Sequence, residues 1–504
     1  MKLVSPLISF HMRQRMSRIQ WFIDNPFEAQ ELVFQDLIVK AATTEWGKNY
    51  RFDELNSQGS FKERIPLQDY ESLKPFIQRS MRGERDVLWP GRTKWFAKSS
   101  GTTSDRSKFI PITNESLHDC HYQSGRDVMT LYLENFPNKN VFAGKGMVMG
   151  GSHSISAVNE DSICGDLSAI LMQNMPIIGE IYRVPKLEVA LLDDWEEKAE
   201  MLVKSTIGEN LTNISGVPSW TLVYLRNALE ATGKRDIAEI WPNLELFMHG
   251  GVNFQPYRTA FEAINPSGTL SYQEVYNASE GFIGIQDRPD KDDMLLLLDN
   301  GIYYEFIPKS EWGKENPRTK SLDEVEMDEI YALVISTNSG LWRYQIGDTI
   351  RFTDLNPHRI KIEGRTKHFI NVFGEELMVA NTDSALSKVC PLHDCEVRDY
   401  TVAPIFMKES DSGGHEWLIE FGKEPSDMSQ FIIDLDKELQ SVNSDYAAKR
   451  SYDAAIKLPV VHSIPSGSFE KWLKMKGKLG GQNKVPRLSN ERKYLEEIQS
   501  MLIN

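Results

Sequence analysis

A segment rich in hydroxyl side chains carries the residue types that bind phosphate. It reads Lys98-Ser99-Ser100-Gly101-Thr102-Thr103-Ser104-Asp105-Arg106-Ser107-Lys108. Such a loop offers backbone N–H groups, hydroxyl donors and a flexible glycine to an anion. The ammonium group of Lys108 adds a positive charge that can reach phosphate oxygens. The order of residues differs from that of a Walker loop, and solvated turns have a similar composition. This segment alone therefore leaves both a phosphate site and an ordinary turn open.

A second polar segment, Tyr276-Asn277-Ala278-Ser279-Glu280, follows a predicted strand over 272–276. Its tyrosine offers an aromatic face on which a purine can stack. Phosphates repel a carboxylate unless a metal ion lies between them, so Glu280 indicates a Mg²⁺ ligand. A core tyrosine followed by a solvated turn is the alternative interpretation.

Two further segments combine glycine with charged residues. Gly347-Asp348 ends a predicted strand, and an aspartate in that position can accept hydrogen bonds from both ribose hydroxyls. Gly364-Arg365-Thr366-Lys367 forms a predicted turn, in which Arg365 could bind a ribose or phosphate oxygen. Ordinary turns again explain both segments when each is taken alone.

The last segment of this kind, residues 475–487, is rich in glycine and lysine and ends in Lys484-Val485-Pro486-Arg487. A lysine delivered by a loop can neutralise charge that develops on a phosphoryl oxygen. Lys476 and Lys478 compete with Lys484 for this role.

Alternating strand and helix patterns must position these segments. Residues 6–46 are mostly helical by apolar spacing, and Asn114 is the expected N-cap of a helix that reaches about residue 135. Strands at 93–97 and 245–248 and helices at 195–208 and 220–231 indicate an α/β fold with much parallel sheet.

Two turn sequences predict β-hairpins. Asn300-Gly301 lies between apolar runs at 294–298 and 303–307, and the segment 337–340 separates two further runs. We place a domain boundary after this region. Residues 1–364 form a large layered α/β domain with mixed sheets, and residues 365–504 form a small mobile α+β domain.

The composition restricts the class of partner. The 504 residues include 57 Lys and Arg against 72 Asp and Glu, a net charge of −15, which argues against nucleic-acid binding. No apolar run approaches the ~20 residues that span a bilayer, so we expect no membrane partner. Four cysteines in so long a chain indicate free thiols, a reducing compartment and hence the cytoplasm.

Taken together and in order, these segments resemble the acyl-adenylate-forming ligase superfamily, and more closely its Gretchen Hagen auxin-responsive acyl-amido synthetase family. The similarity rests on Ser99–Thr103 with Lys108, Tyr276–Glu280 and Arg343–Asp348. The segments Gly216-Val217-Pro218-Ser219-Trp220 and Lys484–Arg487 are also similar to that family. Asp105 departs from the family pattern, which frequently has glycine there, and Gly364–Lys367 is closer to the hinge of the wider superfamily.

The resemblance implies a function and a set of site residues. ATP and Mg²⁺ would convert a small carboxylic acid to an acyl-adenylate, and an amine, typically an amino acid, would then accept the acyl group while the small domain rotates between the two steps. The implied ligands of ATP are Ser99, Ser100, Gly101, Thr102, Thr103, Lys108, Gly250, Gly251, Tyr276, Ser279, Asp348 and Arg365. Glu280 would bind Mg²⁺, and Lys484 would contact acyl and phosphate oxygens.

Two other functions remain open at this point. An acyl-CoA ligase would use CoA as the acceptor, and a catalytically inert nucleotide sensor would bind ATP without turnover. The presence of both Glu280 and Lys484 argues against the sensor. A monomer or a weak dimer is expected.

Overall fold

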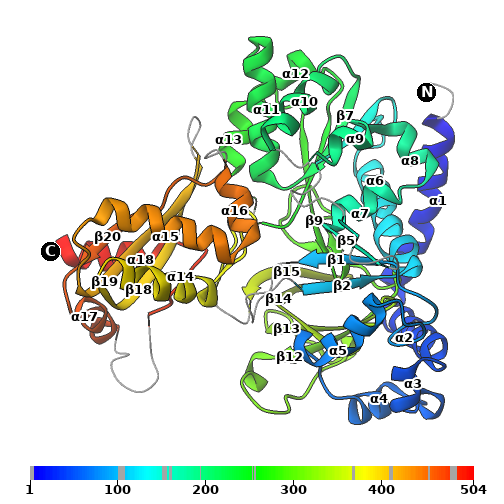
Figure 1. Ribbon diagram of the computed structural model, residues 1–504. Coiled ribbons are helices and arrows are strands. Elements are labelled where there is room, and N and C mark those ends of the chain that lie inside the picture. The colour runs from blue at the N-terminus through cyan, green and yellow to red at the C-terminus, as the bar shows by residue number, and fades with distance from the viewer. Residues whose placement is uncertain are drawn as a thin grey trace.

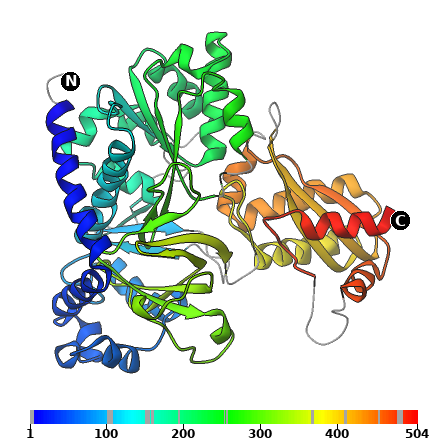
Figure 2. The same cartoon turned by 180° about the vertical axis from the view of Figure 1, so that it is seen from behind.

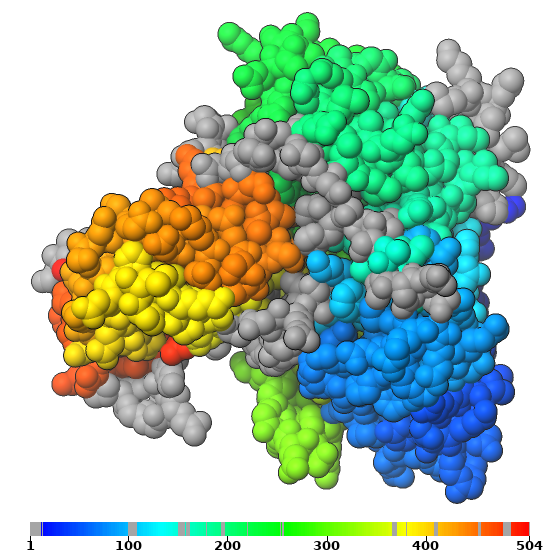
Figure 3. All heavy atoms as spheres, in the orientation of Figure 1, coloured from blue at the N-terminus to red at the C-terminus, as the bar shows by residue number. Residues whose placement is uncertain are grey.

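The chain folds into a large α/β domain and a smaller α+β domain that projects from it as a separate lobe (Figures 1 and 3). A computed structural model describes residues 5–99, 108–149, 156–157, 162–192, 195–252, 254, 257–365, 369–407, 412–451, 455–476 and 485–503. The predicted fold class is confirmed. None of the described helices has the length and apolar character that a membrane span requires.

A mixed sheet runs through the large domain. Among the described residues it contains eleven strands, in the spatial order β12 (Ile302–Pro308), β13 (Ile330–Thr337), β14 (Tyr344–Leu355), β15 (His358–Arg365), β11 (Met294–Leu296), β10 (Gly281–Ile285), β9 (Ser271–Ala278), β8 (Leu246–His249), β7 (Leu211–Gly216), β3 (Lys145–Val148) and β6 (Arg183–Val184).

Strand β9 joins the two halves of this sheet. It pairs in parallel with β8, whose other neighbour β7 is also parallel, and antiparallel with β10. The carboxyl ends of β7, β8 and β9 therefore lie at one edge, where open α/β sheets bind ligands.

A four-stranded sheet holds both described ends of the hydroxyl-rich segment. Its order is β2 (Lys108–Ile112), β1 (Trp95–Ser99), β5 (Ile163–Gly165) and β4 (Ser156–Ala157). Strands β1 and β2 are antiparallel, and Ser99 is the cross-strand partner of Lys108.

Helices surround these sheets (Figures 1 and 2). They are α1 (Ser5–Asp24), α2 (Pro26–Ala41), α3 (Glu45–Asn49), α4 (Gln58–Arg64), α5 (Tyr70–Met81), α6 (Gln123–Asn135), α7 (Leu167–Gln173), α8 (Ile177–Tyr182), α9 (Leu187–Ala190), α10 (Trp195–Thr206), α11 (Pro218–Thr232), α12 (Ile237–Ile240) and α13 (Arg258–Ala263). Helix α11 shows how local sequence sets such bounds: Pro218 opens it, and Gly233 follows its end with a φ of +66°.

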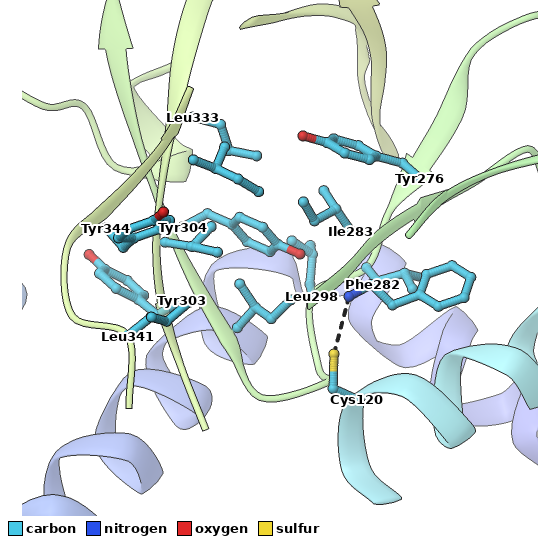
Figure 4. Close-up of a cluster of buried hydrophobic side chains, with 14 of the residues drawn as sticks. Cys120, Tyr276, Phe282, Ile283, Leu298, Tyr303, Tyr304, Leu333, Leu341 and Tyr344 are labelled. Atoms are coloured by element: carbon cyan, nitrogen blue, oxygen red, sulfur yellow. Dashed lines mark hydrogen bonds between the residues drawn. The ribbon is translucent and has the colours of Figure 1, made fainter. Parts of the chain in front are cut away.

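Buried side chains in the core of the large domain hold strands β9 and β10 in place. Tyr276 of β9 and Phe282 and Ile283 of β10 lie in one buried cluster (Figure 4). The backbone N–H of Phe282 donates a 3.3 Å hydrogen bond to Sγ of Cys120 in the π-helical segment η2 (Ser116–Tyr122). This contact ties the β9–β10 hairpin to the helices behind it.

The small domain has its own sheet and helices. The strands are β16 (Phe369–Ile370) paired with β17 (Leu377–Met378), and a three-stranded sheet of β18 (Glu396–Ile405), β19 (Gly414–Lys423) and β20 (Val460–Ile464). The helices are α14 (Val379–Leu392), α15 (Met428–Val442), α16 (Ser444–Arg450), α17 (Ser468–Met475) and α18 (Lys493–Ile503).

Several local predictions are wrong; among them, Gly364 and Arg365 lie at the end of β15 and not in the predicted turn. Asn300-Gly301 does not form a hairpin between β11 and β12, because β11 pairs with β10 and β15 while β12 pairs with β13. The buried amide of Asn300 instead donates to the carbonyl of Phe282. The helix start also differs, since Oγ1 of Thr113 accepts from the N–H of Ser116. The second hairpin, between β13 and β14, is confirmed.

Candidate functional site

A cavity of about 1350 Å³ lies between the carboxyl edge of the large sheet and the small domain. Six of the predicted site residues line it: Lys108, Gly251, Tyr276, Ser279, Glu280 and Asp348. Asn371, Val372, Glu376 and Arg492 line it from the small domain. Segments far apart in the sequence thus meet around a single space, which is large enough for a nucleotide together with a small acid.

A hydrogen bond joins two of the predicted ATP ligands. The hydroxyl of Tyr276 donates to Oδ2 of Asp348 over 2.5 Å, and both residues are buried. Asp348 lies inside β14 and not in the turn that its Gly-Asp sequence predicts, since β14 continues to Leu355. Gly347 before it has a φ of +94°, which a side chain would strain. A carboxylate has two oxygens, so Asp348 can accept from Tyr276 and from a ligand hydroxyl.

Ser279 and Glu280 form the two-residue connection between β9 and β10. Both are partly exposed and both line the cavity. Hydroxyl and carboxylate oxygens are the hard ligands that Mg²⁺ prefers, and Mg²⁺ commonly needs only one or two carboxylates in addition to substrate phosphates. Glu280 therefore fits a Mg²⁺ bound together with ATP. Within the described residues, no group of three or more His, Cys, Asp or Glu side chains could hold a metal ion by itself.

The two glycines at the end of β8 have different structural reasons. A Cβ on Gly250 would lie 2.3 Å from the carbonyl oxygen of Val275, so only glycine allows β8 and β9 to approach this closely. Gly251 has a φ of +82° and lines the cavity. Because Gly250 and Gly251 have no side chains, their backbone is accessible at the edge of the cavity.

Lys108 is buried at the start of β2, and its Nζ lies 5.9 Å from the ring centroid of Tyr70. It faces the cavity from the opposite sheet. Ser100, Gly101, Thr102, Thr103 and Lys484 lie outside the described residues. Ser99 and Arg365 are described only by their backbone, as the last residues of β1 and β15.

One of the two competing lysines, Lys476, and the arginine of the third motif, Arg343, form ion pairs, and Lys478 lies outside the described residues. Nζ of Lys476 pairs with Glu497 over 2.9 Å at the partly exposed surface between α17 and α18. The guanidinium of Arg343 is buried and binds Glu305 through two nitrogens, with a shortest distance of 2.8 Å. These contacts anchor Arg343 in the fold, away from the cavity.

Two ionisable side chains of the cavity wall did not emerge from the sequence patterns. Burial and the nearby Asp292 raise the pKa of Glu274 to about 7. Burial, followed by the charge of Arg258, lowers the pKa of His249 to about 3, so its imidazole is neutral. Strand alternation could have found Glu274, because it lies two residues before Tyr276 on the same face of β9. His249 immediately precedes the two glycines.

His121 in η2 contacts Asn277, the residue that follows Tyr276 in β9. Its Nδ1 lies 3.1 Å from Oδ1 of Asn277, and burial lowers the pKa of the imidazole to about 4. A neutral ring with the proton on Nδ1 donates to this amide oxygen. The side chain after Tyr276 is thereby held against η2.

Two solved structures with this architecture are ligases. The structure matches the GH3.15 acyl acid amido synthetase with a TM-score of 0.62 and 17% identity, over 97% of this chain and 96% of that one. It also matches a 2-hydroxyisobutyryl-CoA ligase in complex with 2-HIB-AMP and CoA, with a TM-score of 0.59 and 13% identity, over 94% and 92% of the two chains. The chain therefore has the fold of the adenylate-forming ligases.

Sequence comparison narrows this class to one family. Models of the GH3 family match in order: the N-terminal domain over residues 15–270, the central domain over 295–365 and the C-terminal domain over 380–493. The chain belongs to the GH3 family.

Relatives from Arabidopsis thaliana span nearly the whole chain. One is indole-3-acetic acid-amido synthetase GH3.4, 23% identical over 100% of this chain and 96% of the relative. Another is 4-substituted benzoates-glutamate ligase GH3.12, 22% identical over 94% and 95%.

Proposed function

We propose that the protein is an ATP-dependent acyl acid amido synthetase. It activates a small carboxylic acid as an acyl-adenylate and transfers the acyl group to an amine, which is an amino acid. Membership of the GH3 family supports the reaction type, since one relative named above is an amido synthetase of indole-3-acetic acid and the other is a ligase of 4-substituted benzoates and glutamate. The observation that carries the proposal is the cavity, in which Lys108, Tyr276, Glu280 and Asp348 meet.

In the first step a carboxylate oxygen of the acid attacks the α-phosphorus of ATP, and the bond to pyrophosphate breaks. Two anions must come together, so positioning and charge neutralisation provide the catalysis. Tyr276 packs against adenine beside Gly250 and Gly251, and Asp348 accepts from the ribose hydroxyls. Lys108 and the hydroxyl-rich segment bind phosphate oxygens, as does Arg365.

Glu280 and the adjacent Ser279 would hold a Mg²⁺ ion, which would supply charge neutralisation for the phosphates. Lys484 contacts the acyl and phosphate oxygens. Met475 at the end of α17 and Val485 bracket the segment that contains this lysine, and α17 lies on the side of the small domain away from the large domain (Figures 1 and 2). Rotation of the small domain delivers Lys484 to the cavity.

In the second step the nitrogen of the amine attacks the acyl carbon of the mixed anhydride. The bond between acyl carbon and phosphate oxygen breaks, AMP leaves and the nitrogen loses a proton. Neither step needs a covalent enzyme intermediate. We place the boundary between the two domains at residues 364 and 365 and the protein in the cytoplasm, as a monomer or a weak dimer.

Acid-dependent exchange of labelled pyrophosphate into ATP tests the first step over a panel of small carboxylic acids, aromatic acids included. Amino acids, other amines and CoA then compete as acceptors. The proposal requires exchange with at least one acid and an amide product. A thioester formed with CoA would identify an acyl-CoA ligase, and ATP binding without exchange would identify a nucleotide sensor.

Two substitutions test the assigned residues. Glu280→Ala and Lys484→Ala should each reduce exchange at least ~100-fold, since each removes charge neutralisation at the phosphates. Glu315→Ala and Lys437→Ala are matched controls, because both side chains are exposed and lie outside the cavity wall. Wild-type exchange in either test variant would show that its role is misassigned.

A further inference from the structure

Trp220, which ends the Gly216–Trp220 segment, contacts the small domain. Nζ of Lys449 in α16 lies 4.7 Å from the centroid of the Trp220 ring in α11. Both residues are buried, with exposed fractions of 9% and 8%. A cation over a tryptophan face is favourable, more so when water is excluded. In Figures 1 and 2, α16 is the part of the small domain that faces α11 and α13.

The surroundings of Lys449 are built to accept its ammonium group. A Cβ on Gly374 would lie 3.2 Å from Cε of Lys449, so glycine makes room for the lysine stem. Burial lowers the pKa of Lys449, while the charges of Asp445, Asp166 and Glu375 raise it. Asp166 belongs to the large domain and the other two carboxylates to the small one. Burying an ammonium group is costly, and part of the compensation therefore comes from across the domains, through Asp166.

Two other polar contacts between the domains involve residues close to the boundary in the sequence. The hydroxyl of Tyr257 donates to the carbonyl of Val372 over 2.6 Å, and Nδ2 of Asn371 donates to the carbonyl of Gly251 over 3.1 Å. Lys449 adds a contact from α16, which lies farther along the chain and packs against Gly374.

The charge of the cavity wall indicates which reaction step this orientation serves. Charged side chains of the described small-domain wall are Glu376, Glu491 and Arg492. The guanidinium of Arg492 is already neutralised by Glu416 over 2.6 Å and Glu496 over 3.0 Å. A wall with two carboxylates and a guanidinium that is already neutralised repels a triphosphate and admits an amine. This charge suits the step after pyrophosphate has left.

We propose that Trp220 and Lys449 are positioning residues that hold the small domain in the orientation used for acyl transfer to the amine. This inference rests on the proposed function. It assigns a role to Trp220, which lies outside the described cavity wall. Loss of the contact should slow amide formation and spare adenylation.

The experiment measures the two half-reactions separately. Pyrophosphate exchange reports adenylation. For acyl transfer, enzyme loaded with acid and ATP is treated with pyrophosphatase, the amine is added, and amide formation is followed in a single turnover. The variants are Lys449→Met, which keeps the stem and removes the charge, Trp220→Leu and Trp220→Phe. Lys437→Met is the control, because Lys437 is exposed on α15.

Lys449→Met and Trp220→Leu should each slow amide formation about 10-fold and leave exchange within about twofold. Trp220→Phe, which keeps an aromatic face, should recover most of the rate. The double variant should be no slower than the slower single variant, since both remove one contact. Equal losses in both half-reactions, or no loss in amide formation, would overturn the inference.

Small-angle X-ray scattering provides a readout that does not depend on chemistry. The wild-type profile should fit the domain orientation described here, and Lys449→Met should broaden the distribution of orientations. A wild-type profile that does not fit, or identical profiles, would overturn the contact. Absence of exchange in the wild type would instead refute the proposed function.

Discussion

The hydrogen bond between Tyr276 and Asp348 gives a sharp test of the nucleotide site. Tyr276→Phe removes one hydroxyl group and keeps the aromatic ring. The hydroxyl donates to a buried carboxylate oxygen at 2.5 Å, so its loss removes a close donor from Asp348. If Asp348 binds the ribose, the variant should bind ATP poorly although its ring can still pack on adenine.

The expected magnitude follows from the charge of the acceptor. A hydrogen bond to an ionised group is worth about 1.5–3 kcal/mol. A loss of about 2 kcal/mol corresponds to a fall of roughly 30-fold in kcat/KM for ATP, at 1.36 kcal/mol per factor of ten. The KM for the acid should change little, because the perturbed groups lie on the nucleotide.

The assay is acid-dependent pyrophosphate exchange with ATP varied at a saturating concentration of acid, then acid varied at saturating ATP. Tyr303→Phe is a matched control. The hydroxyl of Tyr303 donates over 2.8 Å to Gln58 in the core of the large domain, outside the cavity wall. The control loses the same group and should keep the wild-type KM for ATP.

A double-mutant cycle with Asp348→Asn completes the test. The effects of the two substitutions should not add, because each disrupts the same hydrogen bond. The reasoning fails if Tyr276→Phe leaves the KM for ATP unchanged, if it raises both KM values equally, or if the cycle shows no coupling.

Three further predictions concern the support of the site. Gly250→Ala should destabilise the protein by roughly 1–3 kcal/mol and reduce exchange, because its Cβ would press on the carbonyl of Val275; thermal unfolding and exchange measure this, and an unchanged melting temperature would contradict it. Because burial raises the pKa of Glu274 from 4.5 to about 7, the folded state holds a proton that the unfolded chain releases. Stability should therefore fall as pH rises from about 4.5 to 7, and Glu274→Gln should remove this part of the pH dependence of the melting temperature; identical profiles for wild type and variant would refute it. Arg15→Met should cost about 3 kcal/mol in chemical denaturation, because Asp127 would lose a 2.7 Å partner while fully buried; a cost below about 1 kcal/mol would show that the carboxylate is compensated otherwise.

Several turns show where local sequence is an adequate guide. The helix expected at 220–231 is present as α11, which begins two residues earlier at Pro218 and ends before Gly233, and the turn at 337–340 joins two paired strands. Asn300-Gly301 has an equally strong hairpin signal, yet its flanking strands pair elsewhere. The difference lies in the partners: β13 and β14 find each other across the turn, whereas β11 inserts between β10 and β15.

Part of the candidate site was likewise predictable from local sequence, and part was not. The residue types of the Tyr276–Glu280 segment were evident from the sequence because they lie on adjacent residues, and strand alternation could have added Glu274. The hydrogen bond from Tyr276 to Asp348 was not evident, since it depends on strands that are distant in the sequence and adjacent in space.

The sequence by itself determined the order of the polar segments and the α/β class, because these depend on residue identity and on periodicity over a few residues, and the resemblance of those segments indicated the family. Only the tertiary structure decided that Asp348 lies within a strand, that β9 joins the parallel and antiparallel halves of the sheet, and that Lys449 meets Trp220 across the domains. Such contacts arise when burial and pairing compete across the whole chain, and no local pattern records the outcome of that competition.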